Sequence, residues 1–305
     1  MKREDYLIER IDATASYQDL LSFPRYFEIE TVNACNAKCP MCTINDWERR
    51  DGLMSDELFS KIAVEIGQHP EVQRVALYRD GEPLLDKKLG NRIASLKTLG
   101  VRKVGISTNV SLLNERRGIE ILRAGIDEVL LSIDSLIPSV YEELRAGLNF
   151  EEVMENARGF IALRDRFNPS TRIWVRMVRQ MKNKDEYPEY ERFWRTLLKP
   201  SDRLDFKNVH NWGGQLVGFD PITRGETANP CIALWSLMVI FANGDVPQCN
   251  VDYNNKFPLG NVRESSIADL WQSSLQDTRR EAHMNGQRYG ICRGCTVWSD
   301  ERMAA

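Results

Sequence analysis

The sequence lacks several features that define common classes of protein. It contains no run of 18 apolar residues, so no segment is typical of a membrane-spanning helix. Its first residues, MKREDYLIERIDA, are charged where a secretory signal would be apolar. The formal net charge of −3 provides no basic field for nucleic acid. No repeat, low-complexity tract or long linker divides the 305 residues. We therefore expect a cytoplasmic protein, without nucleic-acid or membrane partners, that holds one large domain or one domain plus an appendage.

Cysteine is scarce but strongly patterned. There are seven cysteines, and three of them form Cys35-x3-Cys39-x2-Cys42. In a reducing compartment, clustered cysteines are more often metal ligands than disulfides. Three thiolates leave one iron of a cubane Fe–S cluster open, because standard all-cysteine ligation uses four. A zinc site would need a fourth ligand nearby, and no Cys or His lies between residues 43 and 68.

This cysteine spacing resembles the signature of the radical S-adenosylmethionine (SAM) superfamily. The resemblance implies a [4Fe-4S] cluster on Cys35, Cys39 and Cys42, whose open iron is chelated by the amino and carboxylate groups of SAM. It also implies reductive cleavage of SAM to methionine and a 5′-deoxyadenosyl radical, which abstracts a hydrogen atom. A flavodoxin-type or ferredoxin-type electron donor follows from the same resemblance.

The other four cysteines, Cys231, Cys249, Cys292 and Cys295, lie in the C-terminal part of the chain. Four thiolates can close a second cubane completely, or a zinc site. Their spacing resembles the opening of the SPASM domain, which carries auxiliary Fe–S clusters. A full SPASM domain continues five residues after its CxxC with further cysteines, where this chain has Glu301. That departure matches the shortened "twitch" form with one auxiliary [4Fe-4S] cluster, and structural zinc is the alternative.

Short β-rich runs alternate with helical stretches from residue 26 to about 208. The pattern predicts six strands, at residues 26–32, 74–78, 103–108, 128–134, 172–178 and 204–209. Such alternation predicts right-handed crossovers and a parallel sheet. The expected fold class is α/β: a partial (β/α)6, TIM-like barrel with a small C-terminal α+β auxiliary-cluster module.

We predict three regions along the chain. Residues 1–25 form an N-terminal helical extension packed outside the barrel, 26–225 the radical SAM partial barrel, and 226–305 the twitch/SPASM-like module. Within this module, residues 236–251 predict a β-hairpin turning at Asn243-Gly244, followed by a strand and a helix. In barrels of this kind, chemistry lies at the C-terminal ends of the strands. The cysteine loop follows the first strand, so it lies at that end.

The segment after the second strand, residues 78–83 (Tyr-Arg-Asp-Gly-Glu-Pro), resembles the GGE-like motif of the radical SAM family. In that family the motif's backbone and carboxylate receive the amino group of SAM. The resemblance therefore assigns Asp80, Gly81 and Glu82 to SAM binding, with Asp80 in place of the first glycine. Gly81 allows the close backbone approach that a chelated ligand needs.

Polar residues also end the third and fourth predicted strands. The resemblance assigns these strand ends to the carboxylate and ribose of SAM, and the residues concerned are Thr108, Asn109, Ser132 and Asp134. Ser132 and Asp134 alternate onto one face of their strand, which lets both point into the barrel mouth. The alternative for Asp134 is an N-cap of the next helix.

Two further residues are candidates for SAM contact. Arg176 lies inside the fifth strand, and an arginine that points into a barrel needs an anionic partner, for which the SAM carboxylate is the natural candidate. A solvent-facing Arg176 is the alternative. Met41 precedes the third cysteine, where relatives often carry an aromatic residue against adenine, and methionine fills such a gap with an apolar chain.

The segment after the sixth strand is a candidate substrate site. Its polar and aromatic residues, His210, Asn211 and Trp212, precede two glycines that permit close backbone approach. This combination suits a hydroxylated ligand held between the barrel mouth and the auxiliary module. The alternative is an interdomain turn with a buried tryptophan.

The auxiliary cluster indicates the reaction. With four cysteine ligands it has no open iron, so it can accept an electron but cannot chelate substrate. Loss of a proton and an electron converts a hydroxyl-bearing carbon radical to a carbonyl. This is the logic of the twitch dehydrogenases of butirosin-type cyclitol oxidation, which this cysteine layout resembles. We therefore expect an oxidoreductase acting on a sugar, cyclitol or nucleotide-linked sugar, with no catalytic residue assigned beyond the cluster ligands.

Three other functions stay open. A sugar epimerase would need a thiol to return a hydrogen atom, and three plus four cysteines leave none spare, although a tyrosine donor is possible. A peptide-modifying radical SAM enzyme is the second alternative, but no extra recognition domain precedes residue 26. A binding protein with a structural cluster is the non-enzyme alternative.

Overall fold

A computed structural model of the protein describes residues 2–50, 52–218 and 229–295. The predicted boundary at residues 225/226 and the position of Glu301 lie outside these ranges. The three-region division therefore stays a prediction. Within the described ranges, no helix combines the length and apolarity needed to cross a membrane.

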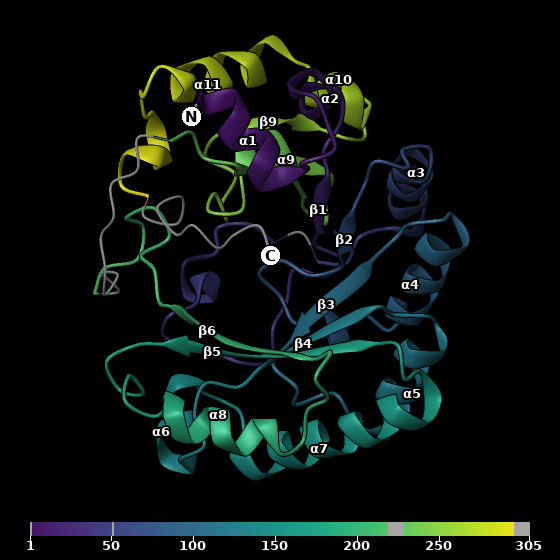
Figure 1. The fold of residues 1–305 in the computed structure, drawn as a ribbon, viewed down its shortest axis with the longest axis vertical. Helices are drawn as coiled ribbons and strands as arrows, with labels where there is room; N and C mark the ends of the chain where they lie inside the picture. The colour runs from purple at the N-terminus through teal and green to yellow at the C-terminus, as the bar shows by residue number, and fades with distance from the viewer. Residues whose placement is uncertain (1, 51, 219–228, 296–305) are drawn as a thin grey trace.

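The fold is built on one sheet of seven parallel strands in the order β6-β5-β4-β3-β2-β1-β7 (Figure 1). The strands are β1 (Tyr26–Ile29), β2 (Arg74–Ala76), β3 (Val104–Thr108), β4 (Glu128–Ser132), β5 (Arg172–Arg179), β6 (Arg203–Asn208) and β7 (Leu237–Ile240). The six strands predicted from the sequence all form, each ending within three residues of its expected limits. The predicted parallel α/β sheet is confirmed.

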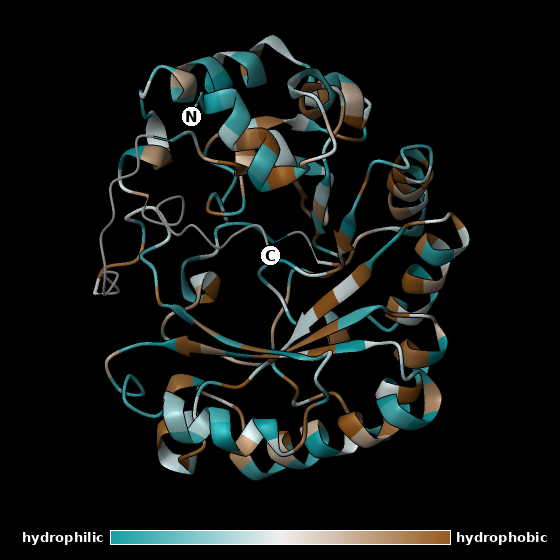
Figure 2. Cartoon of the chain, viewed as in Figure 1, coloured by the Kyte–Doolittle hydropathy of each residue, from teal (hydrophilic) through white to brown (hydrophobic). Residues whose placement is uncertain are grey.

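Helices connect the parallel strands, and their apolar faces pack on the sheet (Figures 1 and 2). They are α3 (Asp56–Gly67), α4 (Leu89–Thr98), α5 (Glu115–Arg123), α6 (Pro138–Leu144), α7 (Phe150–Phe167) and α8 (Tyr187–Arg195), with short 3-10 turns η1 (Thr43–Asp46) and η2 (Pro83–Leu85). Ser55 caps α3, since its side chain accepts from the Leu58 backbone N–H at 3.2 Å. Leu58, Ile62 and Ile66 follow at helical spacing and are buried.

The N-terminal extension forms two helices, α1 (Arg3–Ile11) and α2 (Tyr17–Ser22). They pack against the C-terminal part of the chain at the top of Figure 1, beside α9 (Ala233–Ser236). Leu7, Leu20 and Trp235 share one buried apolar cluster there. The first and last described parts of the chain therefore stabilise each other.

The predicted C-terminal hairpin differs from the structure. The chain turns at Asn243-Gly244 as expected, with the Phe241 N–H donating to the Asp245 carbonyl at 2.9 Å. The two arms then join different sheets: β7 pairs in parallel with β1, while β8 (Asp245–Pro247) pairs with β9 (Pro258–Asn261). The apolar run of β7 is buried in this position. The sequence pattern predicts this strand as one arm of the hairpin, whereas it forms the seventh strand of the main sheet.

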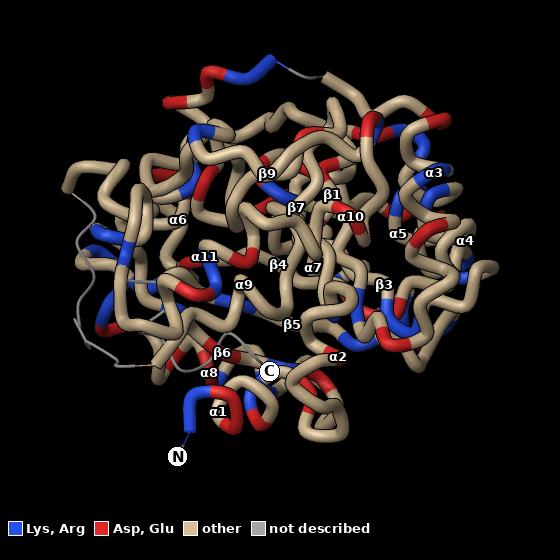
Figure 3. The backbone as a smooth tube through the Cα atoms, turned by 90° about the horizontal axis from the view of Figure 1, so that it is seen from above, with Lys and Arg blue, Asp and Glu red and all other residues tan. Residues whose placement is uncertain are grey.

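The remaining C-terminal elements are α10 (Ile267–Trp271), α11 (Ser274–Met284) and the 3-10 turn η3 (Gly290–Arg293). Ser266 caps α10 in a reciprocal capping box with Asp269. Figure 3 shows acidic and basic residues interspersed along the chain.

Candidate functional site

One cavity of about 280 Å³ lies where the parallel strands end. It gathers most of the site residues predicted from the sequence: Cys35, Cys39, Met41, Cys42, Asp80, Gly81, Glu82, Thr108, Asn109, Ser132, Arg176, His210 and Trp212. Asp134 and Asn211 do not line it. Residues 177 positions apart in sequence meet here because the carboxyl ends of parallel strands lie at one edge of a sheet.

The three cysteines of the first motif face this cavity together. Burial raises the pKa of Cys35 to about 11 and that of Cys42 to about 12. The protein alone therefore disfavours thiolates, which a bound iron cluster would stabilise through its own charge. No three His, Cys, Asp or Glu side chains of the described ranges are already arranged around a metal position. We expect the thiols to turn toward the cluster as it assembles.

Gly81 is required for a close approach between two segments of the site. A Cβ atom at this position would lie 2.4 Å from the Val32 carbonyl oxygen and 2.5 Å from that of Ala34. The next residue, Glu82, donates its backbone N–H to Ala34 at 2.8 Å. The GGE-like motif thus packs directly on the backbone that leads into Cys35, and this contact helps to position the cysteine loop.

The Glu82 carboxylate ties the end of β2 to the end of β3. It accepts hydrogen bonds from Thr108 Oγ1 at 2.8 Å and from the backbone N–H of Asn109 at 2.7 Å. It also accepts from the Leu84 N–H at 3.1 Å. Burial raises the Glu82 pKa to about 7, although these hydrogen bonds oppose the shift. Its contact with the SAM amino group stays a prediction.

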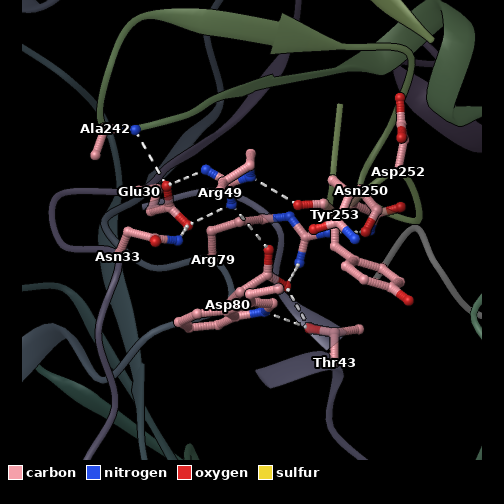
Figure 4. A network of polar contacts seen from close by, with 12 residues as sticks. Glu30, Asn33, Thr43, Arg49, Arg79, Asp80, Ala242, Asn250, Asp252 and Tyr253 are labelled. Atoms are coloured by element: carbon pink, nitrogen blue, oxygen red, sulfur yellow. Dashed lines mark hydrogen bonds and ion pairs between the residues drawn. The ribbon is translucent and has the colours of Figure 1, made fainter. Parts of the chain in front are cut away.

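Asp80 belongs to a buried charge network that joins the cysteine loop to the C-terminal region (Figure 4). Arg79 donates to Asp80 at 2.7 Å and also contacts the Asn250 carbonyl, one residue after Cys249. Arg49 lies 3.6 Å from Asp80 and forms a two-point ion pair with Glu30 at 2.9 Å. Burial raises the Asp80 pKa to about 6, with the Arg79 charge opposing the shift.

Asp134 is buried behind the cavity and positions Arg145, a cavity residue that the sequence analysis did not identify. It is fully buried, and it accepts from Arg145 Nε and from the Val178 backbone N–H, both at 2.7 Å. It does not cap α6, whose N-cap is Ile137. Arg145 lines the cavity, with Nη1 3.8 Å from the Cys39 sulfur. A direct contact between Asp134 and SAM stays a prediction.

Arg176 lines the cavity and has a protein partner for its charge. Its Nε donates to Asp205 Oδ1 on β6 at 3.0 Å, and its guanidinium stacks over Trp174 at 3.7 Å from the ring centre. Asp205 thus supplies the anion that the sequence reasoning assigned to the SAM carboxylate. Contact between Arg176 and SAM stays a prediction.

The segment His210–Gly214 lies between the cavity and the C-terminal cysteines. Trp212 donates its indole N–H to the Met41 carbonyl at 3.2 Å, between two cysteines of the first motif. Gly213 approaches η3 so closely that a Cβ atom would lie 2.7 Å from Ile291. Asn211 does not reach the cavity, because its side chain accepts from the Gly214 N–H at 3.1 Å.

His210 presents a neutral ring to the cavity. Burial lowers its pKa to about 4, with the charges of Lys207 and Arg79 adding to the shift. Its Nδ1 accepts from the Trp212 backbone N–H at 3.2 Å, so Nε2 carries the ring proton. His210 is therefore equipped to donate a hydrogen bond to an oxygen in the cavity.

The four C-terminal cysteines line a second, small cavity. Burial raises the pKa of Cys231 to about 12 and that of Cys292 to about 11. Gln248 Nε2 donates to the Cys292 sulfur at 3.0 Å. Four cysteines converge on one cavity, Cys292 buried and the other three half-buried, which fits a closed four-thiolate site.

Comparisons with protein families agree with this geometry. The model of the radical SAM superfamily matches residues 29–175, and that of the SPASM iron–sulfur cluster-binding domain matches residues 231–296. The chain therefore belongs to the radical SAM superfamily, in its SPASM-containing branch, and is a radical SAM enzyme. SAM and a [4Fe-4S] cluster are the cofactors of the first domain, and the second carries additional iron–sulfur.

Three relatives illustrate the range of this superfamily. The chain is 25% identical to the tungsten-containing aldehyde ferredoxin oxidoreductase cofactor-modifying protein of Pyrococcus furiosus, over 90% of this chain and 87% of that protein. It is 23% identical to the SAM-dependent 2-deoxy-scyllo-inosamine dehydrogenase of Niallia circulans, over 88% and 91%. A probable GTP 3′,8-cyclase of Sulfolobus acidocaldarius is 34% identical, over 40% of this chain and 37% of that protein.

Solved structures share the fold. BtrN in complex with AdoMet and 2-DOIA superposes with a TM-score of 0.62 at 21% identity, over 89% of this chain and 92% of BtrN. Streptococcus suis SuiB bound to its precursor peptide SuiA gives 0.69 at 17% identity, over 90% and 71%. These likenesses confirm the fold, a partial barrel with a small C-terminal region.

Proposed function

We propose that the protein is a cytoplasmic radical SAM dehydrogenase that oxidises an alcohol of a hydroxylated small molecule to a carbonyl. The substrate class is a sugar, cyclitol or nucleotide-linked sugar, and a flavodoxin-type or ferredoxin-type protein supplies the first electron. The observation that carries the proposal is the division of the seven cysteines between two cavities. Three line the cavity of about 280 Å³ at the strand ends, called the large cavity from here on. The other four line the small cavity of the C-terminal part. The likeness to a cyclitol dehydrogenase supports the same choice.

The large cavity supplies groups that would hold SAM and substrate. Cys35, Cys39 and Cys42 would hold the first cluster, which supplies the reductive chemistry that generates the deoxyadenosyl radical. The GGE-like segment, the strand ends and Arg176 are proposed to bind SAM beside it, with Met41 against the adenine. His210 is proposed to donate a hydrogen bond from Nε2 to a substrate hydroxyl, and Trp212 to form the wall beside it. Asn211 is proposed to act indirectly, by holding the turn at Gly214 that follows Trp212.

The electron balance favours a dehydrogenase. Cleavage of SAM consumes one electron, and abstraction of hydrogen leaves a carbon radical on the substrate. Loss of the hydroxyl proton and one electron from this radical gives the carbonyl. Cys231, Cys249, Cys292 and Cys295 would hold the electron acceptor, with the segment after His210 packed between it and the substrate cavity.

The first prediction concerns the product. We expect a carbonyl product, one 5′-deoxyadenosine per turnover, and no solvent deuterium at the reacting carbon. The double variant Cys292→Ala/Cys295→Ala should still cleave SAM but should form at least about tenfold less product, because the substrate radical loses its acceptor. Mass spectrometry of product and nucleoside in heavy water measures both. A double variant that forms product normally would contradict the proposal.

A tyrosine in the cavity gives the epimerase a specific candidate. Tyr78 lines the large cavity and could return a hydrogen atom to the substrate in place of a thiol. In that case the product would keep the mass of the substrate in ordinary water and gain one deuterium in heavy water. Tyr78→Phe would then abolish the isomer while leaving SAM cleavage in place.

A further inference from the structure

His283 lies in the wall of the auxiliary cysteine cavity. It occupies the last turn of α11, is 3% exposed, and lines the same small cavity as the four cysteines. No local motif in the sequence marks His283 as functional, because it stands near the end of a helix and not within a cysteine motif. Its place in the fold brings it next to Cys231 and Cys292.

The orientation of the His283 ring is fixed by a backbone contact. The Cys231 backbone N–H donates to Nδ1 at 3.3 Å, so the ring proton resides on Nε2. Nε2 is buried, and it has no hydrogen-bond partner among the described residues. A buried donor without an acceptor is rare in folded proteins. A group bound in the cysteine cavity would supply the acceptor for this Nε2–H.

Other groups around the cysteines are donors as well. Gln248 Nε2 donates to the Cys292 sulfur, as described above. Arg279 uses Nη2 for the carbonyls of Phe257 and Pro258, both at 3.1 Å, while its buried Nη1 has no partner among the described residues. Gln248, Arg279, His283 and Cys292 also share the wall of an adjoining cavity of about 290 Å³.

We propose that His283 donates its Nε2–H to a sulfur of the auxiliary cluster, and that with Gln248 and Arg279 it raises the reduction potential of that cluster. Sulfides and thiolates are acceptors, which suits a shell composed of donors. Reduction adds one negative charge to the cluster, and hydrogen bonds and a nearby cation stabilise that charge. The consequence, easier capture of the single electron from the substrate radical, rests on the function proposed above.

The hydrogen bond itself can be tested in the unaltered protein. The chain has only three histidines, so labelling with 15N-histidine marks His69, His210 and His283 alone. We expect pulsed EPR of the reduced auxiliary cluster to show a weak 15N coupling. The variant Cys35→Ala/Cys39→Ala/Cys42→Ala, which retains only the auxiliary cluster, should show the same coupling. Its absence from both proteins would overturn the proposal.

Substitutions test the effect on potential in the same triple-alanine background. His283→Phe should lower the equilibrium constant for one-electron reduction of the cluster about tenfold, a fall of about 59 mV in midpoint potential. His283→Gln retains an N–H donor and should recover most of the shift. His69→Phe is the matched control, because His69 stacks on Phe23 and should leave the potential unchanged.

Two further outcomes complete the test. If His283→Phe loads no cluster, Arg279→Gln, on a half-buried side chain, should lower the potential in the same direction. Unchanged potentials in loaded His283→Phe or in Arg279→Gln would overturn the proposal, as would a zinc ion bound by His283. Neither measurement uses substrate, so a shift in potential without a carbonyl product would contradict the proposed dehydrogenase and leave this inference standing.

Discussion

At the scale of the residue, Arg176 and Arg203 present a natural comparison. Both contact the Asp205 carboxylate at 3.0 Å, and both stack on Trp174, at 3.7 and 4.2 Å from the ring centre. Only Arg176 lines the large cavity. Substituting each arginine in turn therefore distinguishes a role in ligand binding, open only to Arg176, from a role in holding β5 against β6, which both share.

The second prediction follows from this comparison. Arg176→Gln should weaken SAM binding about tenfold or more, since it removes a charged donor from the cavity. Iron content should stay the same, because Arg176 is not a cluster ligand. Equilibrium binding of SAM to the anaerobically reconstituted protein measures the change. Arg203→Gln is the control and should alter SAM affinity less than about twofold. Equal losses in the two variants would assign Arg176 a structural role only.

Single residues also show what the sequence could and could not reveal about the site. The cysteines were found by their spacing, Glu82 by its resemblance to a family motif, and Arg176 as a charged residue inside a predicted strand. Arg145 was missed, since it follows a surface helix and reaches Cys39 only through the tertiary fold. The ion pair of Glu30 with Arg49 escaped for the same reason. Glu30 and Arg49 lie 19 residues apart in the connection between β1 and α3, and no local sequence pattern marks such an ion pair.

At the scale of the element, the loop after β2 depends on the absence of a side chain at Gly81. The third prediction is that Gly81→Ala destabilises the protein by about 3 kcal/mol or more and lowers loading of the first cluster, because two backbone carbonyls block its Cβ. Denaturant unfolding of the apo protein and iron analysis measure these effects.

The control for this change lies in helix α7. Gly159 is exposed, and a Cβ atom there would meet nothing within 4 Å. Gly159→Ala should stabilise the protein by about 0.5–1 kcal/mol through helix propensity. A Gly81→Ala variant as stable as the parent and fully loaded would show that the two segments can separate without loss.

The C-terminal turn shows where prediction of elements ends. Strands β1 to β6 follow from local patterns of β-branched and apolar residues between turn signals. The Asn243-Gly244 pair correctly indicated a tight turn. It did not reveal that β7 pairs with a strand more than 200 residues earlier, because pairing of parallel strands is decided by burial of the whole sheet.

At the scale of the whole molecule, two cluster sites share one scaffold. The fourth prediction is that the anaerobically reconstituted protein holds about eight irons and eight sulfides, from two cubanes. The variant Cys35→Ala/Cys39→Ala/Cys42→Ala should hold about four of each. Iron and zinc analysis of both proteins measures this. Four irons and one zinc in the intact protein would replace the auxiliary cluster by a zinc site.

The pairing of β7 with β1 has a consequence for synthesis on the ribosome. One edge of β1 finds its partner only after residues 30–240 have been made. At about 5–20 residues per second, that edge waits roughly 10–40 s with its backbone groups unpaired. Nascent chains would thus expose an unpaired strand edge, which can pair with other chains, for most of their translation. The strand order therefore predicts that chaperones bind the nascent chain at this stage. It also predicts that slow codons before residue 237 increase aggregation by prolonging the exposure of β1.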